Sequence, residues 1–136
     1  MADELLLEIV TPERMAFRGK VEEVTVPGTE GEFGVLRGHA PLLSTLQIGE
    51  MSFLQDKKRI FYAVNTGFAE VVPDRVTILV ETAERADTID RERAKQAKER
   101  AEARLAKLSR EEERDFLQAR AALLRAVTRL NVADKA

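Results

Sequence analysis

The sequence has no cysteine and only one histidine, His39. The absence of cysteine excludes disulfides, thiolate nucleophiles and cysteine-ligated zinc, and it fits a reducing compartment. A single imidazole excludes a histidine-rich metal site, and three serines with one tyrosine leave no credible set of nucleophile, base and orienting group. The patterns GxxxxGKS/T, GxSxG and HExxH are also missing. We therefore expect a chain that is not an enzyme and that binds no metal.

Long apolar runs and a strong charge of one sign are missing as well. No run approaches the ~20 apolar residues that span a bilayer, and the first residues, MADELLLEIV, are acidic where a secretory signal would be basic. The net charge of -2 at pH 7 lacks the basic excess that is typical of a general nucleic-acid binder. We therefore expect a cytoplasmic address, at most a peripheral membrane association, and no nucleic-acid partner.

Glycine and proline are missing from the second part of the chain. All seven glycines and all four prolines lie at or before residue 73. Residues 1–86 carry 9 basic and 14 acidic side chains, whereas residues 87–136 carry 13 basic and 10 acidic ones and are rich in Ala, Arg and Leu. That composition without helix breakers is typical of long helices. We therefore expect two domains, residues 1–86 and residues 87–136.

Residues 1–86 show the apolar–polar alternation of strands with one buried face. No helical stretch separates these segments, so the pattern predicts an antiparallel β-sandwich or barrel. The alternating apolar positions include Leu5, Leu7, Ile9, Val24, Val26, Ile60, Tyr62, Val64, Val76, Ile78 and Val80. Turns are expected at 11–12, 19–20, 27–29, 49–50, 56–58, 65–67 and 73–74.

Residues 87–136 predict two helices that fold back as an antiparallel hairpin, which makes the fold class α+β. Asp87, Thr88 and Asp90 offer N-caps for a helix that ends near Lys107. Apolar stripes at helical spacing are Ala94, Ala97, Ala101, Leu105 and Leu108, then Phe116, Ala119, Leu123, Val127 and Leu130. Because alanine buries little apolar area, we expect the closed form of the hairpin to be only weakly stabilised.

A capping box marks the start of the second helix. Ser109 with Glu112 has the required spacing, and an acidic first turn follows at 111–113.

Arginines occupy matching positions in the two predicted helices. Arg93 and Arg100 lie two turns apart in the first helix, near Asp90, and Arg125 and Arg129 lie one turn apart in the second. In an antiparallel hairpin the end of the second helix approaches the start of the first. Four guanidinium groups would then converge near a helix N-terminus, an arrangement that suits phosphate oxygens.

Two interpretations of these charges stay open. In the first, the arginines bind an anionic ligand, and Glu84 or Asp90 accepts a hydrogen bond from a base amino group or a ribose hydroxyl. In the second, the arginines pair with Glu99, Glu102 and one another across a solvated face. Residue types alone favour the second.

The stretch GTEGEFGVLRGHAPLL, residues 28–43, holds four glycines and the only histidine. Its glycines predict turns with positive φ and tight reversals rather than a phosphate cradle. His39 is expected to be a turn residue that bonds its own backbone beside Pro41. Glu30 and Glu32 are expected on solvated surface.

Four motifs, in order along the whole chain, carry a resemblance to a known family. They are EGEFGVLRGHAPLL (30–43), VETAERA (80–86), IDRERA (89–94) and RAVTRLNVA (125–133). Together they resemble the bacterial epsilon subunit of the rotary proton-translocating ATP synthase. The resemblance implies an N-terminal β-sandwich and a C-terminal two-helix hairpin.

The resemblance also implies partners. In that family one copy per complex sits at the cytoplasmic face of the bacterial membrane, where the sandwich grips the gamma subunit and rests on the proton-carrying c-ring. Glu30, Glu32 and His39 become candidate ring contacts at the sandwich end that faces the ring. The hairpin is compact in one state and extends along gamma in the other, where it blocks ATP hydrolysis. In the extended state Arg120, Arg125 and Arg129 would face acidic surface of the catalytic alpha and beta subunits.

Some bacterial members bind ATP in the compact hairpin. The matching positions are Glu84, Asp90, Arg93, Arg100, Arg125 and Arg129. The resemblance therefore implies ATP as a regulatory ligand, with no other cofactor. A ligand that binds only the compact state shifts the hairpin toward that state and so relieves inhibition. A different class of function is a free-standing small-nucleotide sensor, which would not co-purify with gamma and the catalytic subunits.

Overall fold

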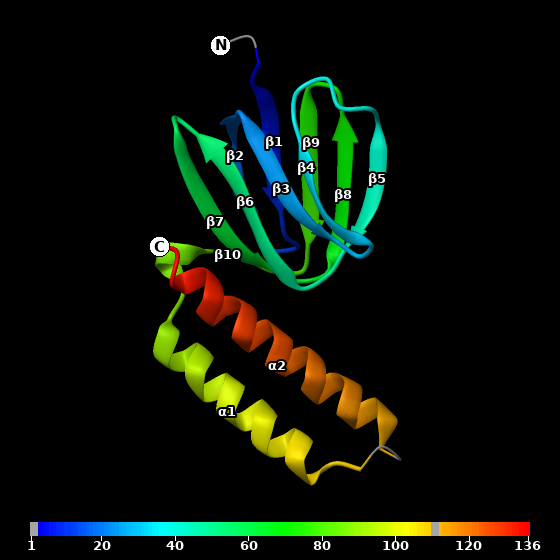
Figure 1. The fold of residues 1–136 in the computed structure, drawn as a ribbon, viewed down its shortest axis with the longest axis vertical. Coiled ribbons are helices and arrows are strands. Elements are labelled where there is room, and N and C mark those ends of the chain that lie inside the picture. Colours follow the sequence, from blue (N-terminus) through cyan, green and yellow to red (C-terminus); the bar gives the residue numbers. More distant parts are fainter. Residues whose placement is uncertain (1–2, 110–111) are drawn as a thin grey trace.

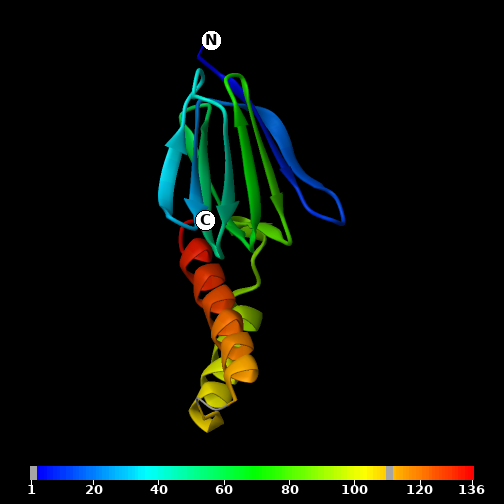
Figure 2. The ribbon, with the colours of Figure 1, turned by 90° about the vertical axis from the view of Figure 1, so that its right-hand side faces the viewer.

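The computed structural model describes residues 3–109 and 112–136, which form ten strands and two long helices (Figure 1). A 3₁₀ turn, η1 (Ala86–Thr88), links the strands to α1 (Arg91–Lys107) and α2 (Glu113–Ala133). The strands are β1 (Leu5–Val10), β2 (Met15–Val21), β3 (Glu23–Gly28), β4 (Gly31–Val35), β5 (Leu42–Leu46), β6 (Gly49–Gln55), β7 (Lys58–Val64), β8 (Gly67–Val72), β9 (Arg75–Val80) and β10 (Ala83–Arg85). The helices project from one end of the strands as a hairpin (Figure 2), which confirms the α+β class.

The strands form one continuous sheet that folds over into two layers. One layer holds β10, β7, β6, β3 and β4, and the other holds β5, β8, β9, β1 and β2. A bridge between Gly28 of β3 and Leu46 of β5 joins the two layers. This arrangement confirms the predicted sandwich.

One strand pair differs from the antiparallel expectation. β1 and β9 run parallel, from Leu6 opposite Arg75 to Val10 opposite Leu79. The directions of these strands are set by their hairpins with β2 and β8. Local alternation carries no information about which distant strand becomes the other neighbour, so the expectation of a wholly antiparallel sheet is wrong at this pair.

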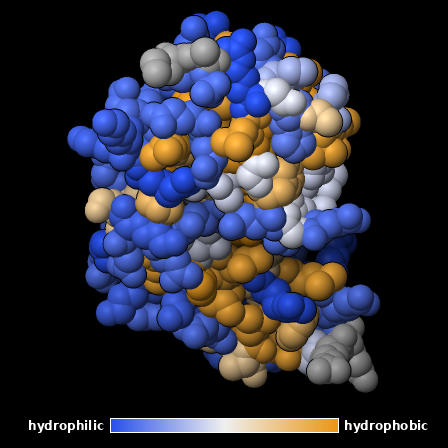
Figure 3. Space-filling model, turned by 45° about the horizontal axis from the view of Figure 1, so that its top comes forward, coloured by the Kyte–Doolittle hydropathy of each residue, from blue (hydrophilic) through white to orange (hydrophobic). Residues whose placement is uncertain are grey.

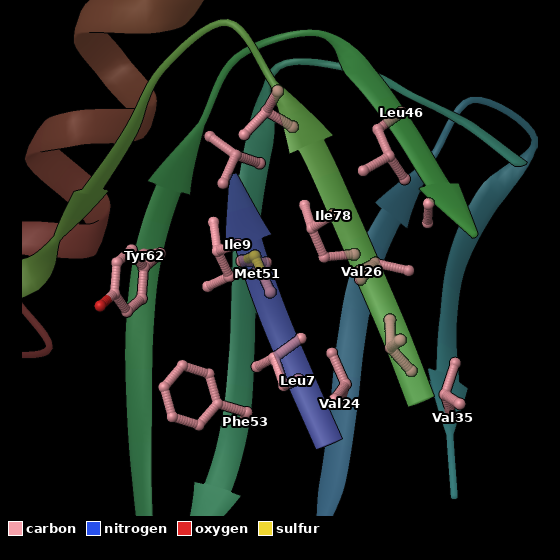
Figure 4. Close-up of a cluster of buried hydrophobic side chains, with 14 of the residues drawn as sticks. Leu7, Ile9, Val24, Val26, Val35, Leu46, Met51, Phe53, Tyr62 and Ile78 are labelled. Atoms are coloured by element: carbon pink, nitrogen blue, oxygen red, sulfur yellow. The ribbon is translucent and has the colours of Figure 1, made fainter. Parts of the chain in front are cut away.

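Inward-facing side chains of both layers form the sandwich core. Phe53 of β6 is fully buried, and its ring centroid lies 4.5 Å from that of Phe17 and 5.8 Å from that of Tyr62. Figure 4 shows Phe53 and Tyr62 among the inward-facing side chains. Each large apolar side chain buried in this way contributes about 1.5–3 kcal/mol. The described members of this core all come from residues 5–83, so the sandwich has a core of its own.

The tightest predicted turn joins β6 to β7. Asp56 and Lys57 have φ angles of 51° and 67°, the left-handed values that two-residue hairpin turns require. This turn and those expected at 11–12, 65–67 and 73–74 are confirmed.

Two other predicted turns are wrong. Residues 19–20 lie within β2 and pair with β1, and residues 49–50 begin β6 and pair with β7. The ladder satisfies their backbone groups in extended form, so these glycines do not mark reversals. The turn expected at 27–29 lies slightly later, at 29–30, because β3 continues through Gly28.

The start of α1 agrees with the sequence and the start of α2 does not. Asp90 is the N-cap of α1, and its side chain accepts a hydrogen bond of 3.0 Å from a backbone N–H of the first turn. The predicted capping box is wrong, because Glu112 is the N-cap of α2 and makes no side-chain capping bond. Its N–H donates instead to the carbonyl of Ser109 at 3.1 Å, so a backbone turn leads into the helix. Glu113 lies in the first turn as expected, whereas Glu111 lies outside the described residues.

Alanines form the seam between the two antiparallel helices. The buried residues there are Ala94 and Ala101 of α1 and Ala119 and Ala126 of α2. Ala126 belongs to neither predicted stripe. Small side chains let the helices approach closely, so larger members of the stripes are only half-buried at the flanks. These half-buried residues are Leu105, Leu108, Phe116, Leu123, Val127 and Leu130.

A second, smaller apolar cluster attaches the hairpin to the sandwich. Its members are Ala63, Ala86, Ile89, Val132 and Ala133, with Phe61 packed against them. Polar contacts surround this cluster: Arg91 of α1 binds Asp134 and donates to the carbonyl of Ala133 at 2.8 Å, and Lys135 Nζ lies 2.6 Å from Glu50 Oε1. Because half of these six side chains are alanine, the cluster stabilises the docked hairpin only modestly.

Candidate functional site

A cavity of about 560 Å³ lies where the helices meet the end of the sandwich. Its sandwich wall comes from the β1–β2 turn, the end of β7 and the segment 81–84 that leads into β10. Its helical wall comes from the start of α1 and the last turns of α2. The cavity therefore exists only while the hairpin is docked, because its two walls belong to the two parts of the chain.

Four of the six predicted ATP-binding residues line this cavity. Glu84, Arg93, Arg125 and Arg129 converge there from β10, α1 and α2. The antiparallel hairpin brings the start of α1 beside the end of α2, as the spacing predicted. Nucleotide binding by these residues stays a prediction.

The other two predicted ATP-binding residues do not line the cavity. Asp90 lies next to it and caps α1 by accepting a hydrogen bond from the N–H of Arg93. Arg100 lies two helical turns farther along α1 and is exposed. A helix advances about 10.5 Å in seven residues, so the backbone at this position lies well away from the cavity.

Glu84 and Arg129 are already paired in the docked form. Arg129 Nη2 donates to Glu84 Oε2 at 3.0 Å, and Arg129 Nε, which is buried, lies 2.8 Å from Glu84 Oε1 with ionic rather than hydrogen-bond geometry. The pair joins α2 to β10. Among the described residues Arg93 and Arg125 make no such pair, so these two guanidinium groups are available to a ligand.

Sequence reasoning found Glu84 but missed the other charged residues of the sandwich wall. Glu13 and Arg14 of the β1–β2 turn and Glu81 after β9 add one cation and two carboxylates. The predicted turn at 11–12 is the only local signal near Arg14, and it does not say which end of the sandwich faces the helices. The complete wall holds four arginines and three glutamates, a mixture that suits a ligand with both anionic groups and hydrogen-bond donors.

Tyr62 lies on β7, close to these charges. Burial raises the pKa of its hydroxyl above the ordinary value of 10.0, while the nearby Arg85 guanidinium acts in the opposite direction. Its ring packs against Phe53 (Figure 4), so the side chain belongs to the core.

The glycine-rich stretch 28–43 is built from turns. Gly31 and Gly38 have φ angles of 130° and 90°, which side chains rarely tolerate, so these two positions require glycine. His39 Nδ1 lies 2.7 Å from the carbonyl oxygen of Ala40, and the backbone N–H of His39 donates to the carbonyl of Leu36 at 3.1 Å. The interpretation of His39 as a backbone-bonded turn residue is confirmed.

The three candidate ring contacts do not lie together. Glu30 lies in the turn between β3 and β4, Glu32 lies on β4, and His39 lies in the loop that follows β4. Five strand residues span roughly 17 Å, so Glu30 and His39 lie at opposite ends of the sandwich. The expectation that all three share one end is wrong, because a hairpin strand carries the chain away from its turn. Contact of each residue with a membrane ring stays a prediction.

Arg120 lies on an exposed part of α2 and does not line the cavity. Two large apolar side chains of α2, Leu117 and Leu124, are 53% and 48% exposed. Figure 3 shows an apolar strip over the helical part of the molecule. The second helix therefore presents both cations and apolar area outside the cavity.

Two classes of feature are not found in the described part of the chain. No group of three or more His, Asp or Glu side chains within 3–109 and 112–136 is arranged to hold a metal ion. Neither described helix has the length and apolar character needed to cross a membrane.

Comparison with known proteins agrees with this architecture. A family model for the ATP synthase delta/epsilon chain β-sandwich domain matches residues 4–86, and one for its long α-helix domain matches residues 87–134. The ATP synthase epsilon chain of Geobacter sulfurreducens is 50% identical over 136 residues, which cover all of this chain and 98% of the relative. The chain belongs to the ATP synthase epsilon chain family. As a member, it is a non-catalytic stalk subunit.

Further relatives support the assignment. The epsilon chain of Geotalea uraniireducens is 52% identical over 136 residues, covering all of this chain and 98% of the relative. A chain in the mitochondrial ATP synthase of Euglena gracilis, solved by cryo-electron microscopy with OSCP, F1 and the c-ring, superposes with a TM-score of 0.81 at 26% identity, covering 96% of this chain and 81% of that one. A chain of the Tetrahymena thermophila central stalk and c-ring structure shares the fold, with a TM-score of 0.53 at 13% identity, covering 96% and 94%.

Proposed function

We propose that this epsilon chain is a rotor subunit whose sandwich couples proton flow to ATP synthesis and whose helices regulate ATP hydrolysis. The sandwich grips the gamma subunit and rests on the proton-carrying ring at the cytoplasmic face of the membrane. One copy serves each complex. The separate core of the sandwich supports this division, because the helices can leave without exposing that core.

The hairpin is the regulatory element in this proposal. It inhibits hydrolysis in an extended form, in which its cations and its apolar strip contact gamma and the catalytic alpha and beta subunits. The alanine seam and the small attachment cluster support an easily opened hairpin, since both bury little apolar area.

ATP is the proposed ligand of the docked hairpin. The observation that carries this part is the cavity between the two parts of the chain, in which Arg93 and Arg125 are unpaired and Glu84 can accept a hydrogen bond. A ligand that binds only the docked form shifts the population toward it. A high concentration of ATP would therefore keep the hairpin docked and relieve inhibition.

Two arginines would have a part in both states. Arg125 and Arg129 line the cavity in the docked form, and they would face acidic surface of the catalytic subunits when the hairpin extends. The same guanidinium group cannot do both at once. Ligand binding and inhibition are therefore mutually exclusive, and no separate signalling path is needed.

Removal of residues 87–136 tests the regulatory role. We expect the truncated chain to assemble with gamma and the ring, to support ATP synthesis, and to raise ATP hydrolysis by the complex. A matched control is Gln96→Ala, which keeps the hairpin and changes an exposed neutral position of α1 that belongs neither to the cations nor to the apolar strip. Unchanged hydrolysis after truncation would overturn the inhibitory role, and failure to co-purify with gamma would overturn the rotor role.

A further inference from the structure

Arg14 lies in a turn that fixes its backbone beside the cavity. Thr11 N–H donates to the Arg14 carbonyl at 2.9 Å, and Arg14 N–H donates back to the Thr11 carbonyl at 3.3 Å. The Thr11 hydroxyl adds a bond of 3.2 Å to the same Arg14 carbonyl. Pro12, between them, restricts the turn further. The side chain therefore projects from a rigid base on the sandwich rather than from a mobile loop.

The Arg14 guanidinium has no partner in the described part of the chain. It makes no ion pair or side-chain hydrogen bond, although Glu13 and Glu81 line the same cavity. Arg93 and Arg125, which line the helical wall of the cavity, likewise make no ion pair with any described residue. Three cations that line one cavity and form no ion pair within the described chain repel one another, and an anion placed among them removes that repulsion.

We propose that Arg14 is a ligand-binding residue that completes the nucleotide site from the sandwich side, so that a bound nucleoside triphosphate clamps the β1–β2 turn to both helices. This inference rests on the proposed function, since it assigns a further contact to the same site. Arg93 and Arg125 belong to the hairpin and Arg14 to the sandwich. A phosphate group held by all three is lost when the hairpin lifts, which makes binding selective for the docked form.

The carboxylates of the cavity limit the class of ligand. Glu13, Glu81 and the paired Glu84 oppose a bare polyanion, but they accept hydrogen bonds from ribose hydroxyls or a base amino group. A nucleoside triphosphate carries both kinds of group. Inorganic triphosphate should therefore bind more weakly than ATP. Arg14 should contribute much less to the binding of AMP than to the binding of ATP.

Calorimetric titration of the full chain with ATP, AMP and inorganic triphosphate tests the assignment. We expect Arg14→Ala to weaken ATP binding by about tenfold or more, as the loss of a charge-assisted hydrogen bond does, and to weaken AMP binding much less. Arg14→Lys should recover part of the loss. The matched control is Arg18→Ala, which removes an arginine that pairs with Glu8 at 3.2 Å outside the cavity and should leave ATP binding within about twofold.

The outcomes separate this inference from the proposed function. If the unaltered chain takes up no ATP at millimolar concentration, the proposed ligand itself is wrong. If Arg93→Ala weakens ATP binding while Arg14→Ala does not, the site stands and the role of Arg14 is overturned. Hydrogen exchange adds a readout of the clamp: saturating ATP should protect α2 more strongly in the unaltered chain than in Arg14→Ala, and equal protection would overturn the clamp.

Discussion

Arg129 of α2 and Glu84 of β10 form a two-contact ion pair that joins the hairpin to the sandwich, with N–O distances of 2.8 and 3.0 Å. Both side chains are about one-third exposed or less. The pair stabilises the docked form without a ligand. In the proposed nucleotide site, a phosphate group that binds Arg129 would have to displace Glu84, so the pair would weaken binding of the ligand.

The first prediction concerns this pair. Glu84→Gln keeps the shape of the side chain and removes its charge, and we expect the docked hairpin to lose about 1 kcal/mol of stability because the contact is partly solvent-screened. Hydrogen exchange of the last turns of α2 measures the loss. The control is Glu8→Gln, which removes a surface pair within the sandwich and should leave exchange in α2 unchanged. Equal effects of the two variants would contradict a docking role for the pair.

A second prediction concerns Lys135, which lies 2.6 Å from Glu50 Oε1 and 5.1 Å from the centre of the Phe61 ring. Lys135→Ala removes an ion pair and a cation–π contact, so we expect faster exchange at 132–136 and a loss of about 0.5–1 kcal/mol in docking. Lys95→Ala, an exposed position on α1, serves as control. Exchange that stays unchanged in Lys135→Ala would show that Lys135 does not help to hold this end.

The alanine seam supplies a third prediction. Ala94 is fully buried between the helices, and Ala94→Leu should force the helices apart at a cost of about 1–3 kcal/mol. Ala103→Leu adds the same side chain on the exposed face of α1 and should be tolerated. Limited proteolysis of the hairpin distinguishes the two. If both variants resist proteolysis equally, the seam is not tightly packed.

The fourth prediction concerns the sandwich core. Phe53→Ala deletes a fully buried ring that packs on Phe17 and Tyr62, and the resulting cavity should cost about 3–5 kcal/mol. Leu117→Ala, on the half-exposed face of α2, should cost far less. Denaturant unfolding, followed by circular dichroism, compares the two. Similar midpoints would contradict the assignment of Phe53 to the core.

The fifth prediction follows from the raised pKa of Tyr62. The folded chain holds the phenolic proton more tightly than the unfolded chain, so the stability due to this group is fully present below pH 10.0. As the pH rises further, the unfolded state loses its proton first, and this stability is lost as the pH passes the folded pKa. Tyr62 is the only tyrosine and the chain has no tryptophan, so absorbance at 295 nm reports it alone. Its midpoint should be higher in the native chain than in denaturant, and coincident midpoints would refute the burial effect.

Much of the site could be predicted from residue spacing. Arg93, Arg125 and Arg129 converge because an antiparallel hairpin leaves little freedom in which helix ends meet. Glu84 joins them because only a short link separates β10 from α1. Arg100 shows the limit of this reasoning, since a shared helix face does not bring a residue two turns away to the same cavity.

The sequence by itself determined the two-part architecture, the buried faces of the strands and the start of α1 at Asp90. Those features depend on local physics: side-chain alternation, helix propensity, and a carboxylate that can cap exposed N–H groups.

Only the tertiary structure decided the remaining features. They are the parallel contact of β1 with β9, the alanine seam, the separation of Glu30 from His39, and the presence of Arg14 in the cavity. Each depends on which distant surfaces meet. Local sequence patterns do not encode that choice, because it is made by the packing of the whole chain.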